Sequence, residues 1–99
     1  MSELVYKYNN NGDLEETIYV CNGKKNGRYT RYCPSGQIVE TCIYIDGIKH
    51  GEYKSFWSNG EIEKICFYNN DKIDGEFKKY YSNGYLEMKQ TYCNGVFIN

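Results

Sequence analysis

Residues 51–75 read GEYKSFWSNGEIEKICFYNNDKIDG, and this stretch decides the fold. Two runs rich in aromatic and β-branched residues flank Asn59-Gly60, and Asn-Gly between such runs is the strongest short-range signal for a β-hairpin. Both residues accept the positive φ angles of a two-residue type I′ turn. A second turn-forming segment, residues 70–75, closes the stretch and is the looser of the two. The stretch therefore predicts one hairpin and a connection to the next.

The same pattern recurs every 24 residues along the whole chain. Four segments align with one another without an insertion: residues 4–27, 28–51, 52–75 and 76–99. One column of this alignment holds Gly12, Gly36, Gly60 and Gly84, and another holds Tyr8, Tyr32, Phe56 and Tyr80. Short connections make consecutive strands antiparallel neighbours. The sequence therefore predicts an all-β fold: a single-layer antiparallel β-meander of four 24-residue hairpin repeats, forming one domain over residues 1–99.

The position of the turn fixes which residues face each other across the hairpin. A two-residue loop at Asn59-Gly60 places Trp57 opposite Ile62, Phe56 opposite Glu63, and Tyr53 opposite Cys66. We expect the more apolar face to be the packed one. That face would carry Tyr29, Tyr53, Phe77, Trp57 and Tyr81, the Leu/Ile column (14, 38, 62, 86), and Tyr44, Tyr68 and Tyr92, and the other face would carry Tyr8, Tyr32, Phe56 and Tyr80.

Composition and charge exclude several classes of partner. Aromatic residues make up 17% of the chain, and 12 basic residues against 13 acidic ones leave a net charge of −1. Such a balance gives no broad cationic field, so we expect no nucleic-acid partner and no membrane association. The mean hydropathy is −0.76 and no run approaches the ~20 apolar residues of a membrane span. The first residues show no signal peptide, and the expected location is cytoplasmic.

The repeat pattern resembles a known family. It reads Gly-Glu-Tyr-x-x-Phe/Tyr-x-Ser-Asn-Gly-x-Leu/Ile, and its clearest copies begin at Gly51-Glu52-Tyr53 and Gly75-Glu76-Phe77. This pattern resembles the MORN repeat variant over essentially the full chain. The resemblance implies an elongated single-layer meander that acts as a scaffold, a protein-binding surface or, occasionally, a lipid-associated platform. Bacterial members of the variant class are often labelled antitoxin-like, and arrays of this composition resemble those of giant DNA viruses.

The histidine and the cysteines do not form the pattern of a catalytic or metal-binding site. The only histidine, His50, occupies a connection column that holds Asn26 and Asp74 in other repeats, which is typical of a solvated turn. The five cysteines lack the paired spacing of a zinc site, and we interpret them as small apolar packing residues. We therefore predict a non-enzymatic protein with no catalytic residues, no metal ligands and no cofactor.

Aromatic residues near the turns are the best candidates for a binding surface. A single-layer sheet cannot cover both of its faces, and exposed aromatic residues often mark interfaces. Trp57 breaks its column, which otherwise holds Asn9, Cys33 and Tyr81. The predicted partner-binding residues are Tyr32, Phe56, Trp57, Tyr80 and Tyr81.

The last four residues are the second departure from the repeat. Val96, Phe97 and Ile98 stand where the other repeats have a polar connection. This segment either folds back to cap the last hairpin or pairs with another chain, and the open edge strands of such an array allow a homo-oligomer.

Three functions are compatible with these observations. The leading hypothesis is a non-enzymatic protein-interaction or scaffold module that binds a protein partner. The alternative is an antitoxin or immunity protein that masks a partner enzyme, and the third is a self-assembling structural component. The sequence does not indicate the partner's identity, the source organism or the face that binds.

Overall fold

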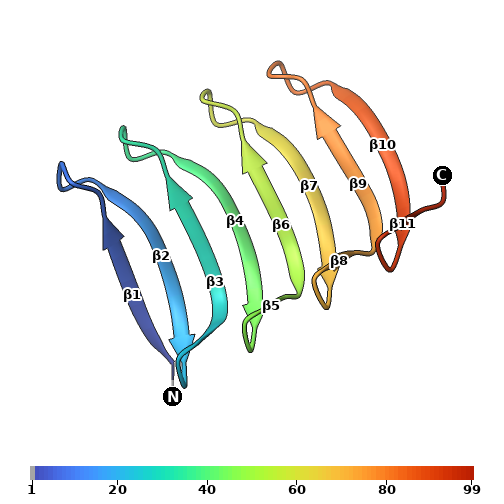
Figure 1. Ribbon diagram of the computed structural model, residues 1–99. Coiled ribbons are helices and arrows are strands. Elements are labelled where there is room, and N and C mark those ends of the chain that lie inside the picture. The colour runs from blue at the N-terminus through green and yellow to red at the C-terminus, as the bar shows by residue number, and fades with distance from the viewer. Residues whose placement is uncertain (1) are drawn as a thin grey trace.

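The computed structural model describes residues 2–99, whose regular structure is entirely β (Figure 1). Eight longer strands form four hairpins, as predicted, and three two-residue strands follow the hairpins. The longer strands are β1 (Glu3–Tyr8), β2 (Leu14–Cys21), β3 (Lys24–Tyr32), β4 (Ile38–Ile45), β6 (Gly51–Phe56), β7 (Ile62–Asn69), β9 (Gly75–Tyr80) and β10 (Leu86–Cys93). The short strands are β5 (Ile48–Lys49), β8 (Lys72–Ile73) and β11 (Val96–Phe97). Within residues 2–99 there is no helix capable of spanning a membrane.

All strands belong to one antiparallel sheet whose spatial order follows the chain. The order is β1-β2-β3-β4-β6-β7-β9-β10-β11, with β5 added to β4 and β8 added to β7. The molecule measures 41 × 32 × 17 Å, and successive hairpins lie side by side from one end to the other (Figure 1). This arrangement confirms the predicted open meander, in which each hairpin is stabilised by its immediate neighbours.

The Asn-Gly segments do not form type I′ turns, which corrects the sequence-based expectation. The N–H of Gly60 donates to the carbonyl of Trp57 at 2.9 Å, and the N–H of Trp57 donates to the carbonyl of Glu61 at 2.8 Å. Gly60 has φ +89°, whereas Asn59 has no positive φ. The side chain of Asn59 instead accepts the N–H of Glu61 at 3.0 Å. The loop is therefore longer, and only its glycine is left-handed, as in a hairpin with a bulge.

The type I′ turns lie in the connections between hairpins, which the sequence analysis described as the looser ones. Asn22-Gly23 has φ angles of 52° and 78°, and Asp46-Gly47 has 50° and 83°. Asn94-Gly95 shows the same pattern, and in the third connection both positions are non-glycine, Asn70 at 51° and Asp71 at 69°. Two consecutive positive φ angles define this turn type. The residues after each turn therefore pair back onto the strand before it, which creates β5, β8 and β11.

A bulge in each hairpin changes the predicted faces. Tyr53 lies opposite Cys66 as predicted, but the register shifts between Ser55 and Phe56, so that Phe56 lies opposite Ile62. The predicted pairs Trp57–Ile62 and Phe56–Glu63 are wrong. Directly opposite residues share a face, so the Leu/Ile column lies with the Phe56 column and not with Tyr53. The same shift occurs in the other three hairpins.

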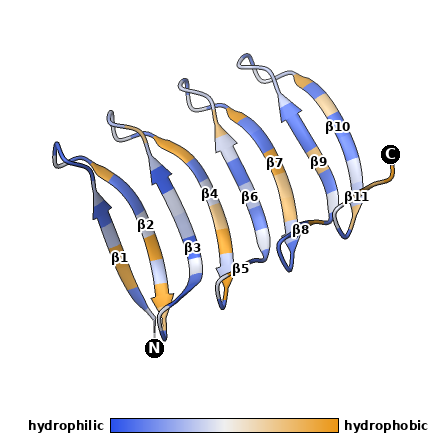
Figure 2. Cartoon of the chain, in the orientation of Figure 1, coloured by the Kyte–Doolittle hydropathy of each residue, from blue (hydrophilic) through white to orange (hydrophobic). Residues whose placement is uncertain are grey.

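Burial is confined to a thin layer. The buried apolar residues are Tyr29, Cys42 and Cys66, with exposed fractions of 8, 3 and 1%. Hydrophobic residues lie in separate patches along the strands (Figure 2). The prediction that cysteines pack as small apolar residues is confirmed for Cys42 and Cys66 but is wrong for Cys93, which is exposed. His50 is exposed as expected for a turn position.

Neighbouring hairpins are joined along a short central ladder and at both ends. β6 pairs with β4 through only two residue pairs, Glu40–Ser55 and Thr41–Lys54. Near the Gly60 turn, the indole Nε1 of Trp57 donates to the carbonyl of Tyr80 at 3.0 Å. At the opposite end, type I′ turns donate to the preceding connection through bonds such as Asp71 N to Lys49 O at 2.9 Å. Trp57 therefore has a structural role that its column position alone does not indicate.

The C-terminal tail pairs with its own chain. The N–H of Ile98 donates to the carbonyl of Thr91 at 2.9 Å, and the N–H of Thr91 donates to the carbonyl of Asn99 at 2.6 Å. The ring of Phe97 packs against Tyr92 with centroids 5.7 Å apart. These contacts favour the capping alternative for Val96, Phe97 and Ile98.

Replacing Gly60 with alanine tests the bulged turn. No atom lies within 4 Å of a Cβ added there, so the cost is that of the left-handed backbone, about 1–2 kcal/mol. We expect a lower urea midpoint by circular dichroism, whereas Ser58→Ala in the same exposed turn should change stability by less than about 0.5 kcal/mol. Equal midpoints for the two variants would contradict the turn assignment.

Candidate functional site

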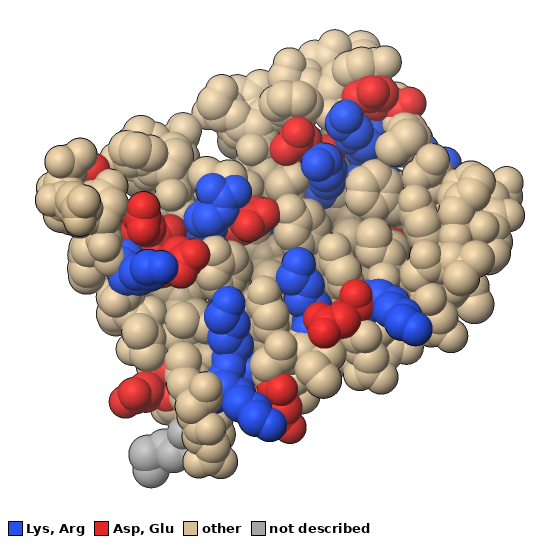
Figure 3. All heavy atoms as spheres, in the orientation of Figure 1, with Lys and Arg blue, Asp and Glu red and all other residues tan. Residues whose placement is uncertain are grey.

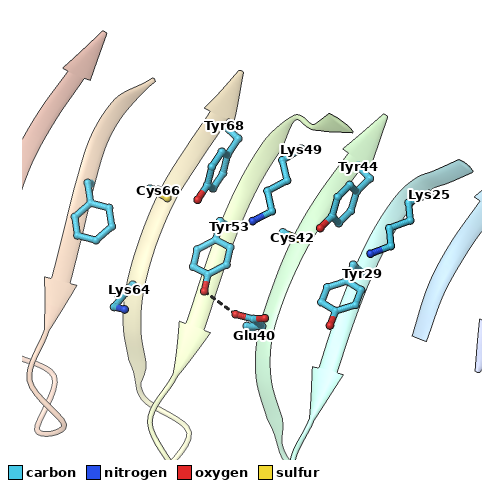
Figure 4. A pocket seen from close by; sticks show the side chains of 11 residues that line it. Lys25, Tyr29, Glu40, Cys42, Tyr44, Lys49, Tyr53, Lys64, Cys66 and Tyr68 are labelled. Atoms are coloured by element: carbon cyan, nitrogen blue, oxygen red, sulfur yellow. Dashed lines mark hydrogen bonds between the residues drawn. The ribbon is translucent and has the colours of Figure 1, made fainter. Parts of the chain in front are cut away.

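A groove lies on one face of the sheet, over the second and third repeats (Figure 4). Its volume is about 310 Å³. Strands β3, β4, β6 and β7 carry most of its wall, and the connections after β2 and β4 each add a lysine. The lining residues are Lys25, Tyr29, Glu40, Cys42, Tyr44, Lys49, Tyr53, Lys64, Cys66, Tyr68 and Phe77.

Edge-to-face aromatic pairs form the walls of the groove. Each pair joins the two strands of one hairpin, and the pairs occupy equivalent positions in the second, third and fourth repeats. Their centroids are 6.1 to 6.4 Å apart and their planes are 71–84° apart, the favoured edge-to-face geometry. The pairs are Tyr29–Tyr44, Tyr53–Tyr68 and Phe77–Tyr92.

A lysine from each of the first two connections lies over the next aromatic pair. The Nζ of Lys25 lies 5.3 Å from the Tyr29 centroid and 5.0 Å from that of Tyr44. The Nζ of Lys49 lies 6.0 Å from the centroid of Tyr53 and 5.0 Å from that of Tyr68. A cation over two rings is held in place by their negative faces, at about 0.5–1 kcal/mol for an exposed pair. The ammonium groups are thereby positioned along the groove.

Glutamate carboxylates on the neighbouring strands hold the hydroxyl ends of two of these tyrosine rings. The hydroxyl of Tyr29 donates to Glu16 at 2.7 Å, and the hydroxyl of Tyr53 donates to Glu40 at 2.7 Å. Glu40 also accepts a hydrogen bond from Arg31 at 3.1 Å. These bonds fix the tilt of each ring and occupy the carboxylate of Glu40, which is the one acidic side chain that lines the groove.

The interface between the third and fourth repeats has different side chains at the positions of this lysine, tyrosine and glutamate. Where Lys25 and Lys49 stand, the next repeat has Ile73, and Phe77 stands where Tyr29 and Tyr53 stand. At the position of Glu16 and Glu40, that interface has Lys64. The hydroxyl and the carboxylate that accepts it are therefore lost together. The first two interfaces therefore carry a lysine, a tyrosine and a glutamate, whereas the third has Lys64 and Phe77 in the groove and Ile73 beyond its lining.

Burial raises the pKa values of the hydroxyl and thiol groups of the groove further above neutral pH. It raises the pKa of Tyr44 to about 12 and that of the Cys66 thiol to about 11. Burial and the hydrogen bond to Glu40 raise the pKa of Tyr53. Burial alone would raise the pKa of Glu40, but the bonds from Tyr53 and Arg31 outweigh it and the pKa is lowered. Protonated thiols and a weakly basic carboxylate are poorly suited to nucleophilic or general-base catalysis.

The structure brings together only part of the aromatic set predicted from sequence, here called the turn patch (Tyr32, Phe56, Trp57, Tyr80 and Tyr81). Phe56 and Trp57 line one cavity together with Ile38, whereas Tyr80 lines another with Ile62. Tyr81 is 51% exposed at the edge of its turn. Tyr32 is half-buried at the end of β3, one repeat before Phe56. Phe56 and Tyr80 thus belong to the face opposite the groove.

The groove lysines were not predicted as site residues. Their signal in the sequence is the recurrence of lysine at positions 25 and 49, each two residues after a type I′ turn. Assigning that turn type to the connection would have placed both lysines in ladders, Lys25 opposite Val20 and Lys49 opposite Tyr44. Among residues 2–99, no three His, Cys, Asp or Glu side chains gather as a metal site.

Comparison with protein families gives one match. The family described as MORN repeat variant matches residues 49–70 and 73–94. These two segments are MORN-variant repeats. The comparisons with curated proteins and with solved structures give no match. MORN repeats are commonly protein- or membrane-interaction modules and are generally non-enzymatic. Two further hairpins of the same 24-residue repeat, β1–β2 and β3–β4, precede the matched MORN repeats.

Removing the hydroxyl of Tyr53 tests the polar anchor of the groove. Tyr53→Phe breaks the bond to Glu40, and we expect a loss of about 1–2 kcal/mol at pH 7, because hydrogen bonds to charged groups are the stronger ones. Tyr8→Phe, at a 58% exposed tyrosine outside the groove, is the control and should be close to neutral. Urea denaturation measures both.

The pH dependence of the same variant has a defined sign. The lowered pKa of Glu40 contributes stability above its unfolded value of 4.5, and that contribution is lost as the pH falls through the folded value. The difference between wild type and Tyr53→Phe should therefore shrink below pH 4.5. A difference that stays constant in acid would show that the lost bond is not coupled to the Glu40 carboxylate.

Proposed function

We propose that this protein is a non-enzymatic protein-interaction and scaffold module, and that the groove is its binding surface. The observation that carries the proposal is the charge state of the groove. Lys25, Lys49 and Lys64 line it, and within residues 2–99 no carboxylate lies within 4 Å of their ammonium groups. Outside the groove Lys54, Lys78 and Lys89 have glutamate partners, whereas in the described part of the chain Lys7, Lys24, Lys72 and Lys79 have none. The feature that distinguishes Lys25 and Lys49 is therefore that their ammonium groups are held over tyrosine rings.

The sheet face that holds the groove carries both signs of charge around it. Figure 3 shows this face, with lysine, arginine and acidic side chains close to one another. A mixed surface resists non-specific association, so a site with cations held over aromatic walls is the part of the molecule best suited to select a partner. An antitoxin or immunity protein that masks a partner enzyme would use the same kind of binding, and the identity of the partner separates the two hypotheses.

Affinity capture from source cells with matched baits tests the proposal. We expect partner proteins captured by the wild type to be lost with Lys25→Glu/Lys49→Glu and kept with Lys24→Glu/Lys72→Glu, which changes the net charge equally at exposed lysines outside the groove. Circular dichroism confirms that each bait is folded. A captured enzyme that is toxic when expressed alone would favour the antitoxin alternative.

A third variant bait, Tyr81→Ala, tests the turn patch. This substitution alters an exposed side chain and leaves the hydrogen bond from Trp57 to the Tyr80 carbonyl intact. Loss of the partner with this bait alone would move the binding surface to the turn patch. Absence of any protein enriched over the beads would contradict the interaction function itself.

Self-association through the sheet edges is a second candidate, favoured by exposed apolar residues at both edges. On β1, Leu4 and Val5 are each 38% exposed, and in the tail Val96, Phe97 and Ile98 are 63, 55 and 59% exposed. Apolar edge strands are templates for pairing with another chain. Light scattering should show a mass that rises with concentration and returns to that of the monomer in Val5→Lys/Ile98→Lys. A constant monomer mass at high concentration would contradict self-association.

A further inference from the structure

The groove has a spacing that limits which ligand can contact successive repeats. Lys25 and Lys49 occupy equivalent positions one repeat apart, and Ile73 continues the row in the next repeat. One repeat corresponds to two strand spacings, about 9.5 Å. A polyproline II segment advances about 9.3 Å in three residues, because its rise is about 3.1 Å per residue. Such a segment running across the strands would present every third side chain to the same row.

The walls of the groove suit an extended segment of this kind. The order along the row is Lys25, Tyr44, Lys49 and Tyr68 (Figure 4): Lys49, on β5, lies opposite Tyr44 on β4, and each ammonium group lies over the tyrosine ring that follows it. Aromatic residues that flank a groove bind proline-rich segments by packing against the rings between them. Tyr29 and Tyr53 donate their hydroxyl protons to Glu16 and Glu40. The protonated hydroxyl of Tyr68, by contrast, can donate to a polyproline II backbone, whose carbonyls have no internal partners.

Charge selects the side chains of the ligand. The ammonium groups of Lys25 and Lys49 are held over tyrosine rings at 5.0 to 6.0 Å and lack a carboxylate within 4 Å among residues 2–99. Ile73 offers an apolar contact at the third position of the row. A ligand therefore needs two acidic residues three positions apart and an apolar residue three positions beyond the second.

We propose that the groove binds a polyproline II segment of a partner protein with the pattern acidic-x-x-acidic-x-x-apolar, whose carboxylates pair with Lys25 and Lys49 and whose apolar side chain packs at Ile73. This proposal rests on the proposed function, since it assigns a ligand chemistry to the same groove. The change from lysine to isoleucine along the row gives the ligand a defined register, because only one placement matches all three positions.

A labelled synthetic peptide, Glu-Pro-Pro-Glu-Pro-Pro-Leu-Pro-Pro, tests the pattern by fluorescence anisotropy with the full chain at low salt. A peptide of the same composition with its two glutamates adjacent should bind about threefold more weakly, because only one carboxylate can then reach a lysine. Replacing both glutamates with lysines should abolish binding. Added salt should weaken the interaction of the first peptide, since its ion pairs are partly exposed.

Variants of the chain assign the contacts. Lys25→Gln/Lys49→Gln should reduce affinity about tenfold, whereas Lys24→Gln/Lys72→Gln should leave it unchanged. Lys49→Arg keeps the cation over the rings and should retain most of the binding. Because the glutamine pair also removes contacts within the fold, thermal melts are compared. Lys64→Gln supplies a third variant that disturbs no aromatic contact.

Three outcomes would overturn the proposal: equal binding of the peptide and its rearranged control, equal effects of the two glutamine pairs, or no peptide binding. Binding to vesicles of anionic phospholipid that is lost in Lys25→Gln/Lys49→Gln, with no peptide binding, would assign the groove to a membrane surface instead. If the peptide fails while partner capture still depends on Lys25 and Lys49, the ligand chemistry is wrong and the proposed function stands. If no partner protein is captured either, both the ligand chemistry and the proposed function are wrong.

Discussion

Lateral stacking of aromatic rings within one sheet face is the interaction on which this structure depends. No second layer covers the sheet formed by residues 2–99, so side chains can bury their surface only against neighbouring strands. The edge-to-face pairs in the second, third and fourth hairpins supply that contact, and the small side chains of Cys42 and Cys66 lie opposite Tyr29 and Tyr53 in the ladders. Large rings beside small thiols leave a hollow between them. The groove is therefore a consequence of how a thin sheet is stabilised.

The polar groups of the groove form a linked set. A lysine lies over the rings of one repeat, and the ring hydroxyl donates to a carboxylate on the strand before it. At the third interface, all three members change at once, to Ile73, Phe77 and Lys64. A phenylalanine beside a glutamate would leave the carboxylate without its donor, which explains why the hydroxyl and the acceptor disappear together. The third interface therefore differs from the first two in a whole group of interacting side chains, the lysine, the tyrosine and the glutamate, which are replaced together.

The repeat and the fold follow from the sequence, because hairpins with short connections leave a meander as the simplest topology. The pairing of Tyr53 with Cys66 was also predictable, since it lies far from the turn. The turn types were not. Asn-Gly accepts a type I′ turn, yet the Asn59 side chain caps its own loop and only Gly60 becomes left-handed. That single added residue moved the Leu/Ile column to the face of Tyr32, Phe56 and Tyr80, where the sequence had already placed these three predicted binding residues.

Trp57 and the C-terminal tail, the two departures from the repeat, also have structural roles that an alignment of the repeats does not reveal. Trp57 joins two hairpins through the carbonyl of Tyr80, and Phe97 takes the position of Lys25 and Lys49 in the last repeat, where it packs on Tyr92. A row that runs lysine, lysine, isoleucine and phenylalanine is graded from cationic to apolar along the array. Identical repeats would offer a ligand several equivalent placements one repeat apart. The gradient makes those placements unequal, so divergence among the repeats gives this periodic sheet a single preferred register for whatever it binds.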